Sequence, residues 1–175
     1  QRDVGTSVIV IRDTTGGAAI TSAIVSGTGP GASACTQAVD VSAIATTELS
    51  IDIDPDTGQT LLHPLPARQF DISSCASVVV DITYHGEDFS APGWRFRYFG
   101  PAEAGEQGSI GWHMLPSVTR IGTSTWRVAL AAGEPGSYRP EDDAIRFVGA
   151  PACIDDRLFA DGLESNPTLM ASCAP

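Results

Sequence analysis

The sequence contains no lysine, and Asn166 is its only asparagine. All ten cationic residues are therefore arginines, a bias expected of a GC-rich bacterial gene. The lack of lysine excludes a Lys–Asn isopeptide cross-link of the kind that strengthens some surface proteins. Because Pro167 follows Asn166, the sequence also lacks an acceptor for N-glycosylation.

Positive charge is scarce as a whole. Ten basic residues stand against 21 acidic ones, which gives a net charge of -11. Nucleic acids and anionic lipids are held mainly by Lys and Arg, so we expect neither as a partner. No apolar run is long enough to cross a bilayer, and we expect no membrane insertion. The chain begins at Gln1 without a leader, so we expect a mature, exported protein.

Helical periodicity is also missing, and strand periodicity takes its place. Apolar and polar residues alternate in the stretches 78–84, 94–98 and 126–130, and turns rich in Gly and Pro separate them. This pattern predicts an all-β, antiparallel β-sandwich of immunoglobulin-like or jelly-roll-like type. We expect an N-terminal strand and glycine hinge at 1–17, the sandwich at 18–150, and an irregular tail at 151–175 with a short helix near 156–163.

The four cysteines are far apart and show no metal-ligand spacing. An even, dispersed set predicts two disulfides, which places the protein in an oxidising compartment, secreted or at the cell surface. Nearness in sequence favours Cys35 with Cys75 and Cys153 with Cys173, and the other two pairings stay open.

The C-terminal stretch CIDDRLFADGLES resembles a short Cys…(I/L)F-x-DGFE-type segment found near the end of many secreted proteins of Gram-negative bacteria. Leu163 stands where that segment usually has Phe, and further residues follow. The resemblance implies secretion. It implies no active-site residue, because those proteins have mixed functions.

Alternate aspartates in the stretch DIDPDTGQ invite a calcium interpretation at Asp52, Asp54 and Asp56. An EF-hand-like loop wants Gly at its sixth position and Glu at its twelfth, and Thr57 and His63 stand there instead. The segment also fits a β-hairpin. Apolar and polar residues alternate in a first strand at 48–53, a Pro-Asp-Thr-Gly turn follows, and residues 60–65 form the second strand. A hairpin turn with solvated acids is the favoured interpretation, with no cofactor.

Other constellations that could carry chemistry are weak, and we expect no enzyme. A glycosidase would need two acidic groups within about 5 to 9.5 Å. The candidates for that alternative are Glu141, Asp142, Asp143, Asp155 and Asp156. The stretch HGED offers His85, Glu87 and Asp88 to a metal, although an ordinary loop is the favoured interpretation. No nucleophile elbow and no phosphate loop is present.

Three tryptophans, Trp94, Trp112 and Trp126, fall in the predicted strands. A row of exposed aromatic rings would bind carbohydrate, since such rings bury much apolar area at little entropic cost. Each tryptophan shares a strand face with other apolar residues, however, which favours core packing. A monomeric, carbohydrate-binding module that uses these tryptophans is the alternative hypothesis.

The N-terminal strand is the most unusual feature of the sequence. Ile9 and Ile11 point one way and Val8 and Val10 the other, so both faces need cover, whereas a strand of a two-layer sandwich normally shows one face to water. A glycine hinge follows at 13–17. The strand either belongs to its own domain or completes the sheet of the next subunit, an arrangement similar to that of donor-strand pilins. The favoured hypothesis is a head-to-tail homo-oligomer, an adhesive or filament-forming protein, whose assembly strand contains Val4, Thr6, Val8, Ile9, Val10 and Ile11.

Overall fold

Antiparallel strands dominate the described part of the chain, which comprises residues 6–12, 19–27, 35, 39–73, 75–102, 109–137 and 144–154 of a computed structural model. The predicted helix at 156–163 lies outside these residues, as do Val4 and Cys173. Every strand pairing among the described residues is antiparallel.

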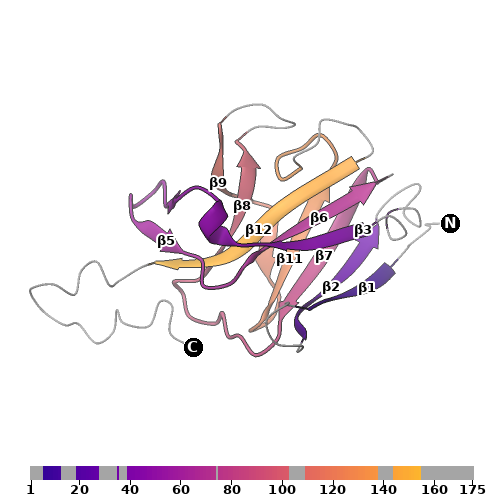
Figure 1. Ribbon diagram of the computed structural model, residues 1–175, viewed down its shortest axis with the longest axis horizontal. Helices are drawn as coiled ribbons and strands as arrows, with labels where there is room; N and C mark the ends of the chain where they lie inside the picture. The colour runs from indigo at the N-terminus through magenta and orange to yellow at the C-terminus, as the bar shows by residue number, and fades with distance from the viewer. Residues whose placement is uncertain are drawn as a thin grey trace, which may run out of the picture.

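Two sheets form the architecture (Figure 1). The first contains, in spatial order, β1 (Thr6–Arg12), β2 (Ala19–Gly27), β7 (Ser77–Tyr84), β11 (Thr125–Ala131) and β10 (Val118–Arg120). The second follows the order β3 (Val39–Ile44), β6 (Ala67–Ser73), β12 (Ala144–Ile154), β5 (Thr60–Leu62) and β4 (Asp52–Ile53), and β12 also pairs with β8 (Arg95–Pro101), which pairs with β9 (Ile110–Met114).

The main core lies between the two sheets. Residues on one face of β7 are buried and those on the other are partly exposed, as the alternation in its sequence predicts. Phe96 of the second sheet contacts Trp126 of the first, with ring centroids 5.7 Å apart. Phe70 and Phe147 belong to the same buried cluster. The prediction of an antiparallel β-sandwich is confirmed.

The second sheet is covered on its outer face as well. A smaller buried cluster there contains Trp112 of β9 with Val148 and Ala150 of β12, and Leu49 packs against it. Leu49 belongs to the excursion between β3 and β6, which comprises a 3-10 turn η1 (Thr46–Glu48), β4 and β5. Because this excursion covers β8 and β9, both faces of β8 are largely buried.

The predicted hairpin exists, but it is shorter than expected. Its ladder pairs only β4 with β5, and Gly58 closes the turn with a φ of 69°, a left-handed value that favours glycine. The burial of its residues is also the reverse of the usual rule that apolar side chains are buried and charged ones exposed. Asp52 is buried, whereas Ile51 and Ile53 on either side of it are exposed.

The last described strand runs further than the sequence pattern indicates. The sandwich was expected to end at residue 150, but β12 continues to Ile154 and pairs in turn with β6, β8 and β5. The pattern faded early because this end of β12 contains Pro151 and small residues, which carry no alternation. The prediction that residues 151–154 belong to an irregular tail is therefore wrong.

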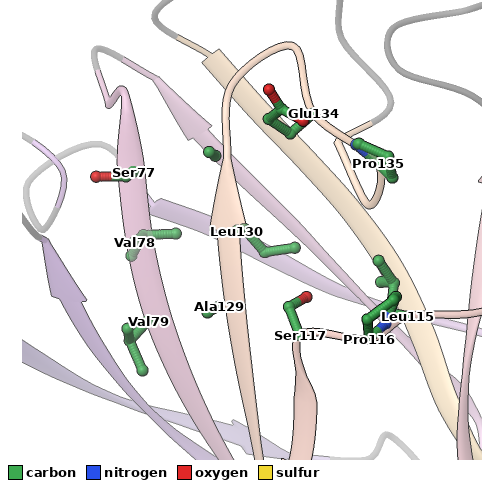
Figure 2. A pocket seen from close by; sticks show the side chains of 11 residues that line it. Ser77, Val78, Val79, Leu115, Pro116, Ser117, Ala129, Leu130, Glu134 and Pro135 are labelled. Carbon is green, nitrogen blue, oxygen red and sulfur yellow. The ribbon is translucent and has the colours of Figure 1, made fainter.

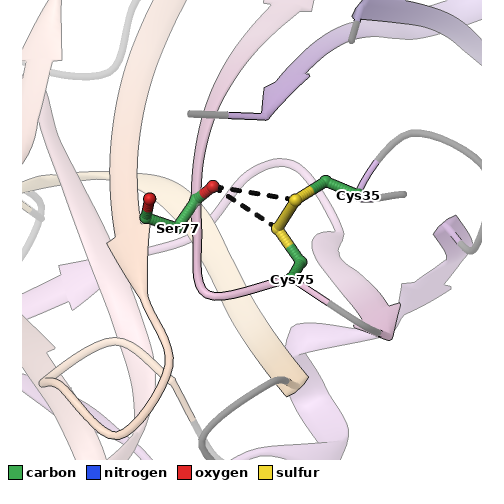
Figure 3. The surroundings of a disulfide bond; sticks show 3 residues. All are labelled: Cys35, Cys75 and Ser77. Carbon is green, nitrogen blue, oxygen red and sulfur yellow. Dashed lines mark hydrogen bonds between the residues drawn. A yellow bond between two sulfur atoms is a disulfide. The ribbon is translucent and has the colours of Figure 1, made fainter. Parts of the chain in front are cut away.

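The predicted disulfide between Cys35 and Cys75 is confirmed. Figure 3 shows both sulfur atoms beside the carbonyl oxygen of Ser77, at 3.8 Å from Cys35 and 3.4 Å from Cys75. Cys153 is also disulfide-bonded, and its partner lies outside the described residues. Both cysteines of the first bridge are buried at one end of the core.

Candidate functional site

The assembly strand predicted from the sequence is described over Thr6–Arg12, where it forms β1. It pairs with β2 of the same chain over seven residue positions, from Thr6 opposite Ser26 to Arg12 opposite Ala19. The register shifts between Ile11 and Arg12, so the ladder is regular up to Ile11 and irregular at its end. Among the described strands, β1 pairs with β2 alone, and Figure 1 shows it at the outer edge of its sheet.

Four other strands lie at sheet edges in the described residues, namely β10, β3, β4 and β9. They have 3, 6, 2 and 5 residues, against 7 for β1. Natural edge strands avoid unwanted pairing through shortness, charge or irregularity. β3 carries Asp40, β4 carries Asp52, β9 contains Gly111, and β10 ends in Arg120. β1 is longer than all of them and has four consecutive apolar residues, with its only charge at the irregular end.

A buried ion pair is the main polar constellation inside the described part of the molecule. The guanidinium of Arg97 in β8 donates from Nε to Oδ2 of Asp52 at 3.0 Å and from Nη2 to Oδ1 at 2.7 Å. Arg97 Nη2 also donates to the carbonyl of Trp112 at 3.3 Å. The pair thus joins the β4–β5 excursion to the outer face of the second sheet.

His63 completes this cluster. Its Nε2 lies 2.9 Å from Oδ2 of Asp52, and its Nδ1 lies 3.1 Å from the carbonyl oxygen of Pro151. The imidazole stacks on Trp112, with ring centroids 4.0 Å apart. Because both ring nitrogens face oxygens of the protein and the side chain is only 6% exposed, His63 is not placed to contact a substrate. We therefore interpret the cluster as a fastening of the excursion and not as a catalytic dyad.

Asp52 is ionised under ordinary conditions. Burial alone would raise its pKa, but the hydrogen bonds from His63 and Arg97, together with their charges, outweigh burial and hold the pKa below its ordinary value of 3.8. The sequence analysis did not find this cluster. The available signal was Arg97 itself, a charged residue in the middle of an otherwise aromatic strand, RFRYF.

The carboxylates of two proposed calcium ligands, Asp52 and Asp54, interact with other residues of the protein. Asp52 is paired with Arg97 and His63, and the carboxylate of Asp54 lies 3.4 Å from Nε of Arg95. Asp54 also accepts a hydrogen bond from the backbone N–H of Asp56 at 2.9 Å, which shapes the turn. Within the described residues no group of three acidic, His or Cys side chains converges as a metal site. Calcium binding at these aspartates stays a prediction without such a cluster to support it.

All three tryptophans are buried, as core packing predicts. Trp94 and Trp126 contact Phe89 in the main core, with centroid distances of 4.9 Å and 5.8 Å, while Trp112 lies in the outer cluster. They therefore belong to two different clusters and form no exposed row. The carbohydrate-binding alternative loses its proposed platform.

The other candidate groups are either outside the described residues or engaged locally. The acidic residues outside the described part of the chain are Glu141, Asp142, Asp143, Asp155 and Asp156. His85 contacts the hydroxyl of Ser22, with Nε2 and Oγ 2.8 Å apart, and Asp88 accepts from the backbone N–H of Ser90 at 2.8 Å. These contacts explain His85 and Asp88 as ordinary loop residues.

A pocket of about 400 Å³ opens beside the end of the short strand β10 (Figure 2). Its walls are mainly aliphatic, with Leu130 from β11, Leu115 before β10 and Val78 from β7, and Glu134 stands at the side. The volume is within the range of small-molecule sites. It holds no cluster of groups that indicates a particular chemistry.

Comparisons with protein families, curated proteins and solved structures give no match to this chain. In the described part of the chain, none of the helical segments has the length and apolar character needed to cross a membrane.

Proposed function

We propose that this protein is an exported, non-catalytic structural or adhesive subunit that joins to other copies through β1. The observation that carries the proposal is the contrast between β1 and the other sheet edges. β1 is the longest edge strand among the described residues, and it has the most aggregation-competent sequence. An oxidising, extracellular location agrees with the Cys35–Cys75 disulfide and with a second disulfide at Cys153.

The mode of joining that we propose is strand exchange. In it, β1 of one copy leaves its own β2 and forms the same ladder with β2 of the next copy, so every backbone pair from Thr6 to Arg12 is recovered. In this proposal residues 13–17, whose sequence DTTGG contains two glycines, serve as the hinge. Because donor and acceptor surfaces are different, the contact is head-to-tail and produces a chain of subunits when it does not close.

Cross-linking tests the proposal. Val8 and Ile24 are direct partners in the β1–β2 ladder, and Ile24 is exposed, so the double variant Val8→Cys/Ile24→Cys brings two thiols to disulfide distance. Exchange predicts a ladder of covalent multimers on a non-reducing denaturing gel, which collapses to the monomer on reduction. Each single-cysteine variant is the control for random oxidation.

A monomer whose two new cysteines are joined within one chain, with no multimers, would overturn strand exchange. The same preparations are examined by electron microscopy and light scattering, beside a variant that lacks residues 1–12. We expect filaments or large particles from the intact chain and none from the shortened one. Large particles of unchanged size after truncation would show that β1 is not the joint.

A further inference from the structure

Four large apolar side chains are exposed on the outer side of the second sheet. Ile51 is 78% exposed, Ile53 55%, Ile110 57% and Met114 51%. The first two belong to residues 51–53, which comprise β4 and the residue before it and which we call the β4 segment, and the last two belong to β9. We call these four residues the β4–β9 patch. An exposed apolar group of this kind marks a contact surface, because single exposed residues are common but clustered ones are not.

We infer that the four residues share one region of the surface, because the β4 segment lies against β9. The indole Nε1 of Trp112 donates to the carbonyl of Ser50 at 2.8 Å, and Arg97 Nη2 reaches both the carbonyl of Trp112 and, at 3.5 Å, that of Ile53. Ile110 and Met114 are two positions before and after Trp112, so they share its strand face. Ile51 and Ile53 flank Asp52, which points inward to Arg97, so their side chains point outward.

The end of the last described strand lies close to this patch. Ile154 of β12 is the Cα partner of Leu61 in β5, and Leu61 is the Cα partner of Asp52 in β4. These three residues form one row across three strands. At a strand spacing of about 4.8 Å, Ile154 is about 10 Å from Asp52, which stands between Ile51 and Ile53.

We propose that the β4–β9 patch is the docking surface for this chain's own C-terminal segment, residues 155–175. Leu158 and Phe159 follow Ile154 by four and five residues, and a chain of that length extends about 13 to 18 Å. This reach covers the distance from Ile154 to the patch, so the two apolar residues arrive there without a long connection. The disulfide at Cys153 ties the polypeptide at the position where the segment begins.

Proteolysis at Arg157 reports on this docking. The sequence has no lysine, and Arg157 is the only arginine after Arg146, so trypsin has one site in the segment. The double variant Ile51→Glu/Ile53→Glu places charge in the patch and should accelerate cleavage at Arg157 at least tenfold. Because a disulfide can retain the fragment, the products are reduced before mass spectrometry.

Ile121→Glu is the matched control, since Ile121 is an exposed isoleucine that follows β10 in the other sheet. It should leave the cleavage rate at Arg157 unchanged. Circular dichroism and the urea midpoint of each variant show whether the sandwich is intact. If Arg157 is cleaved at the same rate in the unaltered chain, the double variant and the control, the segment does not dock on the patch.

A reciprocal variant tests the other side of the contact. Leu158→Ser/Phe159→Ser should accelerate cleavage at Arg157 to the same extent as the patch variant, and the combination of both should add nothing further. Additive rates would overturn the proposal. A second copy on the patch would give a different result: Ile51→Glu/Ile53→Glu would lower the particle mass in light scattering while cleavage at Arg157 stayed constant. None of these outcomes depends on exchange of β1.

Discussion

Arg97 and Asp52, 45 residues apart in the sequence, face each other in a two-point ion pair in which each side chain is almost completely buried. Arg97 belongs to β8 and Asp52 to β4, so the pair connects the covering excursion to the sheet beneath it. A buried charge without its partner lowers the stability of the fold strongly, because it is neither hydrated by water nor balanced by an opposite charge.

We therefore expect Asp52→Asn and Arg97→Met each to destabilise the protein by about 3 to 5 kcal/mol. The measurement is the free energy of unfolding from urea titration. The control is Asp81→Ala, which breaks the exposed Arg127–Asp81 pair of the first sheet and should lower the free energy of unfolding far less, because solvent screens that pair. Equal losses for the buried and the exposed pair would contradict this prediction.

Acid should weaken the protein through the same residue. The folded-state pKa of Asp52 is lower than in the unfolded chain, so its stabilising effect is complete above the ordinary value of 3.8 and is lost as pH falls through the folded value. We expect the urea midpoint to decrease below pH 4 and Asp52→Asn to flatten that decrease. A variant with the same acid sensitivity as the unaltered chain would show that other carboxyl groups dominate.

Alkali should act through Tyr84. Burial raises the pKa of its phenol far above the ordinary value of 10.0, although the charge of Arg68 acts in the opposite direction. The folded state therefore keeps the proton longer than the unfolded state does, and stability is lost as pH rises above 10. We expect Tyr84→Phe, which preserves the ring against Phe89, to unfold at a higher pH than the unaltered chain. The pH midpoint of unfolding, followed by tryptophan fluorescence, checks this.

The Cys35–Cys75 disulfide should be a major source of stability. It closes a loop with a sequence separation of 40 residues, and loops of that size lose about 3 to 4 kcal/mol of unfolded-state entropy when cross-linked. We expect the double variant Cys35→Ala/Cys75→Ala to lose roughly that amount in chemical denaturation. A loss below about 1 kcal/mol would mean that the unfolded chain retains structure around this loop.

Alternation predicted which face is buried in the strands that have one face in the main core. It did not predict the second buried face of β8 or the burial of Asp52 in β4. In β7 and β11 the buried positions are those that the sequence indicates, because water lies on their other face. In the β4 segment the usual rule would bury Ile51 and Ile53, yet Asp52 is buried because it pairs with Arg97 and His63. That partnership arises only when distant segments meet, so a local pattern does not contain it.

The first strand also shows that a local sequence pattern does not predict which segments pair. Its apolar sequence was sufficient to predict a strand, and β1 is one. The sequence did not indicate whether its partner would be β2 of its own chain, because a strand that is apolar on both faces fits many edges. The Cys35–Cys75 pairing was predictable from nearness in the chain, whereas the two tryptophan clusters required the three-dimensional arrangement.

The second sheet depends on β12, which pairs with β6, β8 and β5 and is the last strand that the structure describes. All described strands of the first sheet precede residue 132, so these strands can pair before β12 has been synthesised. The second sheet has no such option, since its central strand β12 follows all its other described strands in the sequence. Formation of the second sheet must therefore wait for the synthesis of β12, and pairings over such long sequence separations form slowly.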